Sequence, residues 1–352
     1  EEFIPILYKG KQNLPIKSIC QISQNELCLG TDGKGAKIFN IPKQLITDYP
    51  FDNNYLDSGT SKVHSVLKDN AGNLWIAIYQ KGVMMIPAQP NSFKYIGYKS
   101  INKNIIGSNC ITSLCRDHEG ILWIGTDNDG IYGITTELKQ RVHYAPHDSP
   151  SSVPSTVFGL YEDSEHNLWF GSYTNGLGRL DKKTGQCSYL QNLTDKHGNR
   201  IQRVYDLVED QDKRLWIATM GAGLFYYDLK TGQSVYDPKF NAATKKYKWI
   251  SCLLYAGDNH LYVGTYDGIR CIDLSTDDFK TEEILSRHII HSLYEDPQGN
   301  IWIGNSERLA EWNPQTQQLK TYTTAHGLSS NAVYAIKGDG QDNLWISTNA
   351  GM

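Results

Sequence analysis

Short apolar stretches alternate with polar turns along the whole chain, and the same order returns about every 40 to 48 residues. Each unit opens with an apolar run, such as residues 63–67 or 204–208. A polar turn that begins with Asp follows and leads into a Leu-Trp-Ile run, whose side chains should alternate between the two faces of a strand. Few segments have helical periodicity, so the pattern predicts an all-β chain.

The second half of each unit contains two more predicted strands. A third strand starts after a glycine, as in residues 130–134 and 223–228, and a Thr-Gly turn leads to a fourth strand. That fourth strand often ends in tyrosine, at Tyr144, Tyr189, Tyr236 and Tyr322. Four strands at this spacing predict the four-stranded blades of a β-propeller.

The Asp turn and the following strand form a repeated sequence motif, which we call the Asp–Trp motif. Its clearest copies are residues 69–76 and 117–126. Asp accepts backbone N–H groups and closes the turn, while glycine supplies positive φ. The Trp ring offers a large surface to bury against a neighbouring blade. The Trp position recurs at residues 28, 75, 123, 169, 216, 262, 302 and 345, with Cys28 and Tyr262 as the two exceptions.

A small pair, Gly-Thr in its simplest form, follows the Trp strand in most units. We expect small residues there because the inner strands crowd around a central channel. The pairs are residues 30–31, 125–126, 171–172, 218–219, 264–265 and 347–348.

The fold prediction is therefore an all-β β-propeller of four-stranded blades, with seven to eight blade-like repeats over residues 1–352, truncated at both ends. Residues 3–8 indicate the outer strand of a blade whose start is missing, and the last unit contains only its two inner strands. The end pieces could share one blade and close an eight-membered ring. Alternatively, the chain straddles two propellers with a boundary near 100–108, since residues 77–78 break the pattern and residues 87–109 are less patterned.

Charge and composition exclude some classes of protein. The net charge is −4 and the pI about 6.2, which argues against a nucleic-acid-binding surface. No stretch approaches 18 apolar residues, so we expect no membrane-spanning segment in this part of the protein. The seven cysteines form no C-x-x-C pair and leave the compartment open. Cys20 and Cys28 could face each other across one hairpin, where a disulfide is possible.

The Asp–Trp motif, D-x-x-G-N-L-W-I-G-T, is followed by a glycine-led third strand and a T-G turn. This combination resembles the two-component regulator propeller repeat. Residues 327–333, before the last Asp turn, are also similar to that family in spacing and residue types. The resemblance covers nearly the whole chain. Two units depart from it: residues 27–29 lack both Asp and Trp, and Ala256 stands where Asp is usual.

The resemblance implies the periplasmic sensor region of a hybrid two-component histidine kinase from gut Bacteroidetes. Such sensors carry two seven-bladed propellers, an immunoglobulin-like domain, a membrane helix and a cytoplasmic kinase. They dimerise, and many detect oligosaccharides. By itself this chain is then expected to be a sensing module with an oligosaccharide ligand, no catalytic residues, no cofactor, and contact with a membrane only through absent downstream segments.

Candidate ligand-binding residues follow the small pairs, in loops that share one face of a propeller with the connections between blades. Their mixture of rings, amides, carboxylates and a guanidinium suits a sugar, whose C–H face stacks on rings while its hydroxyls need donors and acceptors. The candidates are Asp127, Asn128, Asp129, Tyr173, Thr174, Asn175, Met220, Tyr266, Asp267, Ser306, Glu307 and Arg308.

Metal binding is not expected from the sequence. Asp127 and Asp129 lack the loop and distal Glu of an EF-hand. The histidine pairs 143/147 and 288/291 have no evident third ligand.

Two other functions remain open. One is a propeller enzyme acting on glycans, because the Asp turn resembles the sialidase Asp-box, although Asp precedes Trp here by six residues rather than five. The other is a protein-interaction platform without a small ligand. Our hypothesis is that glycan binding on a loop face, or between propellers, changes the geometry of a dimer and so controls a distant kinase.

Overall fold

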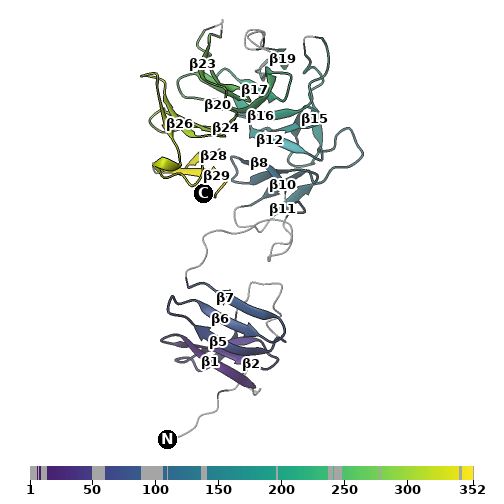
Figure 1. Ribbon diagram of the computed structural model, residues 1–352. Helices are drawn as coiled ribbons and strands as arrows, with labels where there is room; N and C mark the ends of the chain where they lie inside the picture. The colour runs from purple at the N-terminus through teal and green to yellow at the C-terminus, as the bar shows by residue number, and fades with distance from the viewer. Residues whose placement is uncertain are drawn as a thin grey trace. The chain divides into compact units, whose positions relative to one another are not determined.

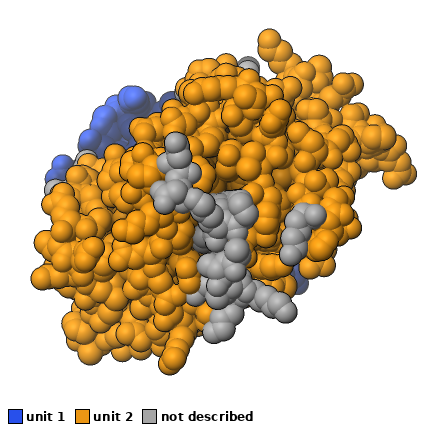
Figure 2. Space-filling model, turned by 90° about the horizontal axis from the view of Figure 1, so that it is seen from above, with its two compact units in different colours: residues 1–107 blue, residues 108–352 orange. Residues whose placement is uncertain are grey.

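The computed structural model describes residues 6, 8, 14–49, 60–88, 106–108, 110–135, 141–195, 197–236, 241, 248–276, 279–340 and 343–351. Within these residues the regular secondary structure is almost entirely β-strand, as the sequence predicts (Figure 1). It divides into two compact units, residues 1–107 (unit 1) and 108–352 (unit 2), which Figure 2 colours separately. Among the described residues no helix has the length and apolar character needed to cross a membrane.

Unit 1 contains a four-stranded and a three-stranded antiparallel sheet, each in sequence order. The expected outer strand at residues 3–8 and most of the run 87–109 lie outside the described residues. The strands are β1 (Ile16–Ser23), β2 (Glu26–Thr31), β3 (Ala36–Asn40), β4 (Leu45–Asp48), β5 (Val63–Lys68), β6 (Leu74–Ile78) and β7 (Gly82–Ile86).

In its described residues, unit 2 contains five four-stranded antiparallel sheets and a two-stranded one. Within each sheet the strands again lie side by side in sequence order. A 3-10 helix, Thr324–His326, precedes the last sheet. The strands are β8 (Ile111–Arg116), β9 (Leu122–Thr126), β10 (Ile131–Ile134), β11 (Arg141–Tyr144), β12 (Val157–Glu162), β13 (Leu168–Ser172), β14 (Leu177–Leu180), β15 (Cys187–Tyr189), β16 (Val204–Glu209), β17 (Arg214–Thr219), β18 (Leu224–Asp228), β19 (Gln233–Tyr236), β20 (Ile250–Tyr255), β21 (His260–Thr265), β22 (Gly268–Asp273), β23 (Thr281–Ser286), β24 (Ile290–Glu295), β25 (Ile301–Asn305), β26 (Leu309–Asn313), β27 (Gln318–Tyr322), β28 (Val333–Gly338) and β29 (Leu344–Thr348).

The first strand of each sheet is the inner strand of a blade. In unit 2 the inner strands β8, β12, β16, β20, β24 and β28 contact one another in succession and follow one another around the middle of the unit (Figure 1). Apolar layers fill the space between successive sheets. One such layer joins Trp169 of one blade to Leu207 and Leu215 of the next. This arrangement confirms a β-propeller built of four-stranded blades.

In five of the described sheets the Asp–Trp motif forms a hydrogen bond between the Asp carboxylate and the Trp indole. Asp210 illustrates it: one carboxylate oxygen accepts the backbone N–H of Arg214 at 3.0 Å, and the other accepts Trp216 Nε1–H at 2.7 Å. The same acid–indole bond joins residues 69 and 75, 117 and 123, 163 and 169, and 296 and 302. The six-residue spacing is fixed by this bond, which explains why Ala256 occurs in the repeat that has Tyr262 instead of Trp.

The small residue before each Thr or Ser packs against the inner strand of the next blade, so the crowding of inner strands that we expected takes the form of a close contact between neighbouring blades. A Cβ on Gly171 would lie 2.5 Å from the carbonyl oxygen of Val204, the first residue of the following inner strand. Gly125 meets Val157 and Gly264 meets Ile290 in the same way. Close approach between neighbouring sheets therefore selects glycine here.

The possible disulfide does not form. Cys20 and Cys28 are directly opposite each other in the β1–β2 register, as expected, but both are free thiols. Burial raises the pKa of Cys28 to about 12, so this thiol is an inert core residue.

Candidate functional site

The loops between second and third strands are short and held by one hydroxyl group. Thr126 Oγ1 donates to the carbonyl oxygen of Gly130 at 2.9 Å and accepts the backbone N–H of Asp129 at 3.1 Å. Ser172, Thr219 and Thr265 make the equivalent pair of bonds. The second residue of each small pair therefore fixes the loop that carries the candidate residues.

Each loop is also bonded to the residue that precedes the inner strand of its own blade. The backbone N–H of Asp127 donates to Cys110, and that of Met220 donates to Arg203 at 3.0 Å. Tyr266 donates in the same way to Trp249 at 3.1 Å. The candidate residues of these loops thus lie at the starting end of the inner strands. We call this side of unit 2 the loop face.

Asp127, Asn128 and Asp129 are engaged within the fold. Asp127 Oδ1 accepts the Thr156 hydroxyl at 2.7 Å, and Asn128 adopts φ +79° in the turn. The Asp129 carboxylate accepts the Tyr132 hydroxyl and lies 3.4 Å from His143 Nε2. The two carboxylates point to different partners, in keeping with the absence of a calcium loop.

Ser306, Glu307 and Arg308 form a loop of different construction, because buried Asn305 replaces the usual Thr. Asn305 Oδ1 accepts the backbone N–H groups of Glu307 and Arg308, each at 2.9 Å. Ser306 Oγ lies 3.1 Å from His291 Nε2, and burial lowers the pKa of that imidazole. This loop is a polar cluster separate from the aromatic residues described next.

Tyr173 and Tyr266 belong to a group of rings on the loop face that spans three successive blades. Phe158 lies 5.8 Å from Tyr173 and 5.0 Å from Tyr205 between ring centroids. Trp249 lies 5.7 Å from Tyr266. We call Phe158, Tyr173, Tyr205, Trp249 and Tyr266 the aromatic platform.

The outer three rings of the platform remain open to solvent. Tyr173 is 43% exposed, Trp249 40% and Tyr266 43%. Burial raises the pKa of Tyr205. Exposed aromatic side chains that gather on one face of a protein are candidates for contact with a partner or a ligand.

Arg203 and Met220 lie beside the platform. The Arg203 guanidinium is 5.1 Å from the centre of the Tyr173 ring, within range of a cation–π contact. Within the described part of the chain no carboxylate is within ion-pair distance of Arg203, whose backbone has φ +35°. An exposed, unpaired guanidinium next to rings can bind a hydroxyl or an anionic group of a ligand.

Thr174 and Asn175 follow Tyr173 in the same loop. The backbone N–H of Asn175 is bonded to Ser172, and its carbonyl oxygen accepts Arg200 Nη2 at 3.2 Å. Asp267, beside Tyr266, accepts the backbone N–H of Arg287 through its carbonyl oxygen. The contacts of these residues are thus made within the fold.

Asp206 is an inner-strand carboxylate next to the platform. Its two oxygens accept the backbone N–H groups of Leu253, at 2.8 Å, and Leu207. Burial raises its pKa to about 6, because these bonds only partly offset the loss of water. Ser113, Gly159 and Ser292 hold the same inner-strand position in other blades.

Sequence reasoning missed Phe158, Arg203, Tyr205, Asp206 and Trp249. All five lie just before or at the start of inner strands, where we expected only structural residues. A signal was available, because Phe158, Tyr205 and Trp249 lie at or next to the start of three successive inner strands, and Tyr334 holds the same position as Phe158 and Tyr205 in a fourth.

Comparison with known families supports the repeat assignment. Five segments match the family described as two component regulator propeller: residues 105–128, 151–174, 200–221, 284–307 and 327–350. Together they cover about a third of the chain, all from residue 105 onward. A search among curated proteins found no match.

Solved structures share the fold at low identity. The extracellular domain of a putative one component system from B. thetaiotaomicron is 21% identical, with 95% of this chain and 46% of that chain covered and a TM-score of 0.62. The extracellular domain of a putative hybrid two component system from the same organism is 20% identical, with 96% and 50% covered and a TM-score of 0.50. PorZ of Porphyromonas gingivalis, a surface component of the type-IX secretion system, is 11% identical, with 96% and 62% covered and a TM-score of 0.56. The chain spans about half the length of the first two structures.

Proposed function

From a chain whose repeats are those of the two component regulator propeller family, we propose a ligand-sensing module outside the cytoplasm that binds an oligosaccharide on the aromatic platform. The parent protein would be a hybrid sensor histidine kinase in which this region is periplasmic and has no catalytic role. Similarity to extracellular domains of putative one- and two-component systems supports this proposal.

The observation that carries the proposal is the set of three exposed rings on the loop face, Tyr173 from one blade and Trp249 and Tyr266 from the next blade but one. The fold does not require them: the residue after the small pair is Asp127 in one blade, Met220 in another and Ser306 in a third. Tyr173, Trp249 and Tyr266 instead present ring faces to solvent. Sugar rings stack their C–H faces on such surfaces, and each stacked aromatic contributes a large contact area.

Polar groups at the edge of the platform suit the hydroxyl groups of a sugar. The unpaired Arg203 guanidinium offers several donors in one plane. The polar residues of the Tyr173 and Tyr266 loops, Asn175 and Asp267 among them, add an amide and a carboxylate close by. Because Arg203 lacks a carboxylate partner among the described residues, an oligosaccharide with an acidic group would bind more tightly than its neutral counterpart.

We also propose that the two units belong to two successive propellers, with the boundary near residues 100–108. The division of the chain into two compact units at residue 107 supports this arrangement. Ligand binding would then act on a homodimer through differential affinity for its two states.

Calorimetric titration against a panel of neutral and acidic oligosaccharides tests the proposal. We expect one-site binding that is weakened at least tenfold by Trp249→Ala or Tyr266→Ala, because each removes a stacking surface. Tyr79→Ala is the matched control, because Tyr79 holds the same loop position in unit 1, is also exposed, and stacks on His64. Conversion of the sugar to product would instead favour a propeller enzyme, and absence of binding across the panel would favour a protein-interaction platform.

A further inference from the structure

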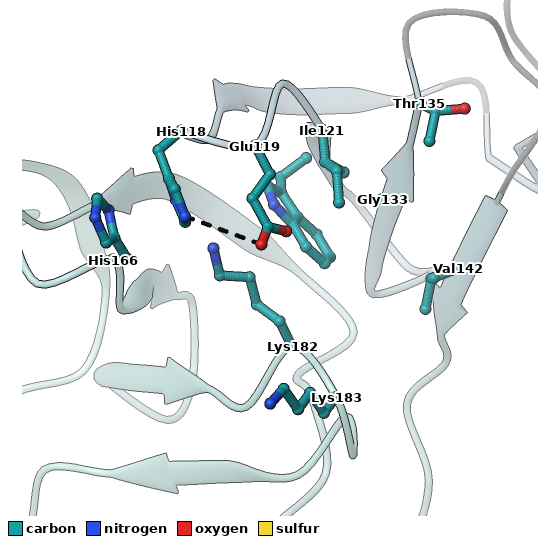
Figure 3. A pocket seen from close by; sticks show the side chains of 10 residues that line it. His118, Glu119, Ile121, Gly133, Thr135, Val142, His166, Lys182 and Lys183 are labelled. Carbon is teal, nitrogen blue, oxygen red and sulfur yellow. Dashed lines mark ion pairs between the residues drawn. The ribbon is translucent and has the colours of Figure 1, made fainter.

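A second cluster lies on the side of unit 2 opposite the loop face, where the Asp turns of two adjacent blades meet. His118 follows Asp117 in the first turn, His166 lies in the second turn, and Glu162 ends β12. His118 Nδ1 is 2.7 Å from Glu162 Oε1, and the two imidazole rings stack with centroids 3.7 Å apart. One ligand atom from each of the three residues lies within 4.8 Å of the others. Figure 3 shows the two imidazoles facing each other.

Glu162 belongs to the fold and is held in place by it. Its Oε2 accepts the backbone N–H of His118 at 2.7 Å. Glu209 accepts Ser164, and Glu295 accepts Gly257, in the same way between other blades. The carboxylate is therefore pre-oriented at each of these junctions, with Oε1 of Glu162 directed at the imidazole.

The two histidines are additions to this repeated arrangement. The residue after the turn Asp is Asn70, Ser164 or Gln211 in other repeats. His166 adopts φ +66° at a position that Gly120 and others fill with the same left-handed backbone. Only this junction, among the described residues, brings two imidazoles and a carboxylate together.

We infer that His118, Glu162 and His166 bind a divalent transition metal ion of the zinc type. Imidazole nitrogen and carboxylate oxygen are ordinary zinc ligands, and water completes the shell at an exposed site. Ligand atoms of one zinc ion lie about 3.3 Å apart in tetrahedral geometry, so small rotations of the two exposed rings suffice. The ion would tie two adjacent blades together.

The surroundings fit this assignment. Glu119 Oε1 lies 4.0 Å from His118 Nε2, the ring nitrogen that does not contact Glu162, and Figure 3 marks this ion pair. Metal-bound histidines commonly donate that second N–H to a carboxylate. A cavity of about 260 Å³ borders both histidines and gives water and ions access.

Lys182 is the competing cation. Its Nζ lies 2.7 Å from Glu162 Oε1 and 3.2 Å from Asp117 Oδ2. Burial alone would raise the pKa of Glu162, but the hydrogen bonds from Lys182 and His118 hold it below its usual range. A bound ion would take the place of Lys182 at Glu162, while Lys182 retains Asp117.

The test uses His166→Gly in the whole chain, freed of metal and titrated with zinc chloride by calorimetry at neutral pH. Glycine suits the left-handed backbone at residue 166, so the fold should be preserved. Lys213→Gly is the matched control at the same turn position of the next blade, where φ is +69°. We expect one zinc ion per wild-type or control chain, and at least tenfold weaker binding in His166→Gly.

A second readout separates this site from the other histidines of the chain. The melting temperature should rise with zinc in the wild type and the control but not in His166→Gly or His118→Asn, in which the backbone N–H to Glu162 is retained. Equal zinc affinity in wild type and His166→Gly would overturn the assignment. So would the absence of saturable binding to the wild type.

Discussion

Replacing Asp210 with alanine tests the claim that the acid–indole bond holds each blade together. The carboxylate accepts Trp216 Nε1–H at 2.7 Å, Arg214 Nε–H at 2.6 Å and two backbone N–H groups of its turn. Asp210 and Trp216 are both buried. Each buried donor left without an acceptor costs about 1–3 kcal/mol, and water can reach the turn amides, so we expect Asp210→Ala to lower the free energy of unfolding by about 3–5 kcal/mol.

A double-mutant cycle isolates the bond itself. Trp216→Phe removes the indole N–H, and the coupling free energy between the two substitutions should be about 1.5–3 kcal/mol, the range for a hydrogen bond to a charged group. The assay is equilibrium chemical denaturation followed by circular dichroism.

The control is Asp212→Ala in the same turn. The exposed Asp212 carboxylate contacts Arg214 at 2.9 Å, so its loss should cost less than about 1 kcal/mol. Zero coupling between residues 210 and 216, or an equal cost for Asp210→Ala and Asp212→Ala, would refute the reasoning.

Three further predictions concern the inner strands. Because the pKa of Asp206 is raised to about 6 in the folded state, wild-type stability should fall by up to about 3 kcal/mol as the pH rises from 4 to 7, and urea midpoints of Asp206→Asn should lack this slope. Gly171→Ala should cost at least about 1–3 kcal/mol in a thermal or urea melt, since its Cβ would meet the backbone of the next blade, whereas Gly257→Ala, with no heavy atom nearer than 3.6 Å, should be nearly neutral. Leu207→Ala should cost about 2–4 kcal/mol by the same assay, and a cost below about 1 kcal/mol would contradict its place in the apolar layer between two blades.

The blade architecture was predictable because every repeat contains the same kinds of sequence signal. The Asp turn, the Trp strand and the glycine-led third strand all point to one four-stranded sheet, and the structure places them so. The reason for the small pairs was not predictable. Gly171 is small because Val204 of another blade approaches it, and a repeat pattern contains no information about contacts between blades.

The candidate site was predicted only in part. Tyr173, Met220 and Tyr266 were found from their place after the small pair, and the structure joins them to Arg203 and Trp249 through backbone hydrogen bonds. Those two residues precede inner strands, about 17 positions earlier in each blade, and only the pairing of the strands brings them to the same face.

The zinc cluster was not predicted for a similar reason. His118 and His166 are 48 positions apart along the chain, and neither lies in a recognisable metal-binding spacing. Their approach results from the contact between two Asp turns, each of which is fixed by its own acid–indole bond.

The central claim is that the aromatic platform is the place where a sugar binds. The most direct measurement is a crystal structure of the chain with an oligosaccharide that binds in calorimetry. We predict that the sugar ring stacks on Trp249 and Tyr266 and that a hydroxyl or acidic group contacts Arg203. A sugar bound elsewhere, with the platform empty, would contradict the account.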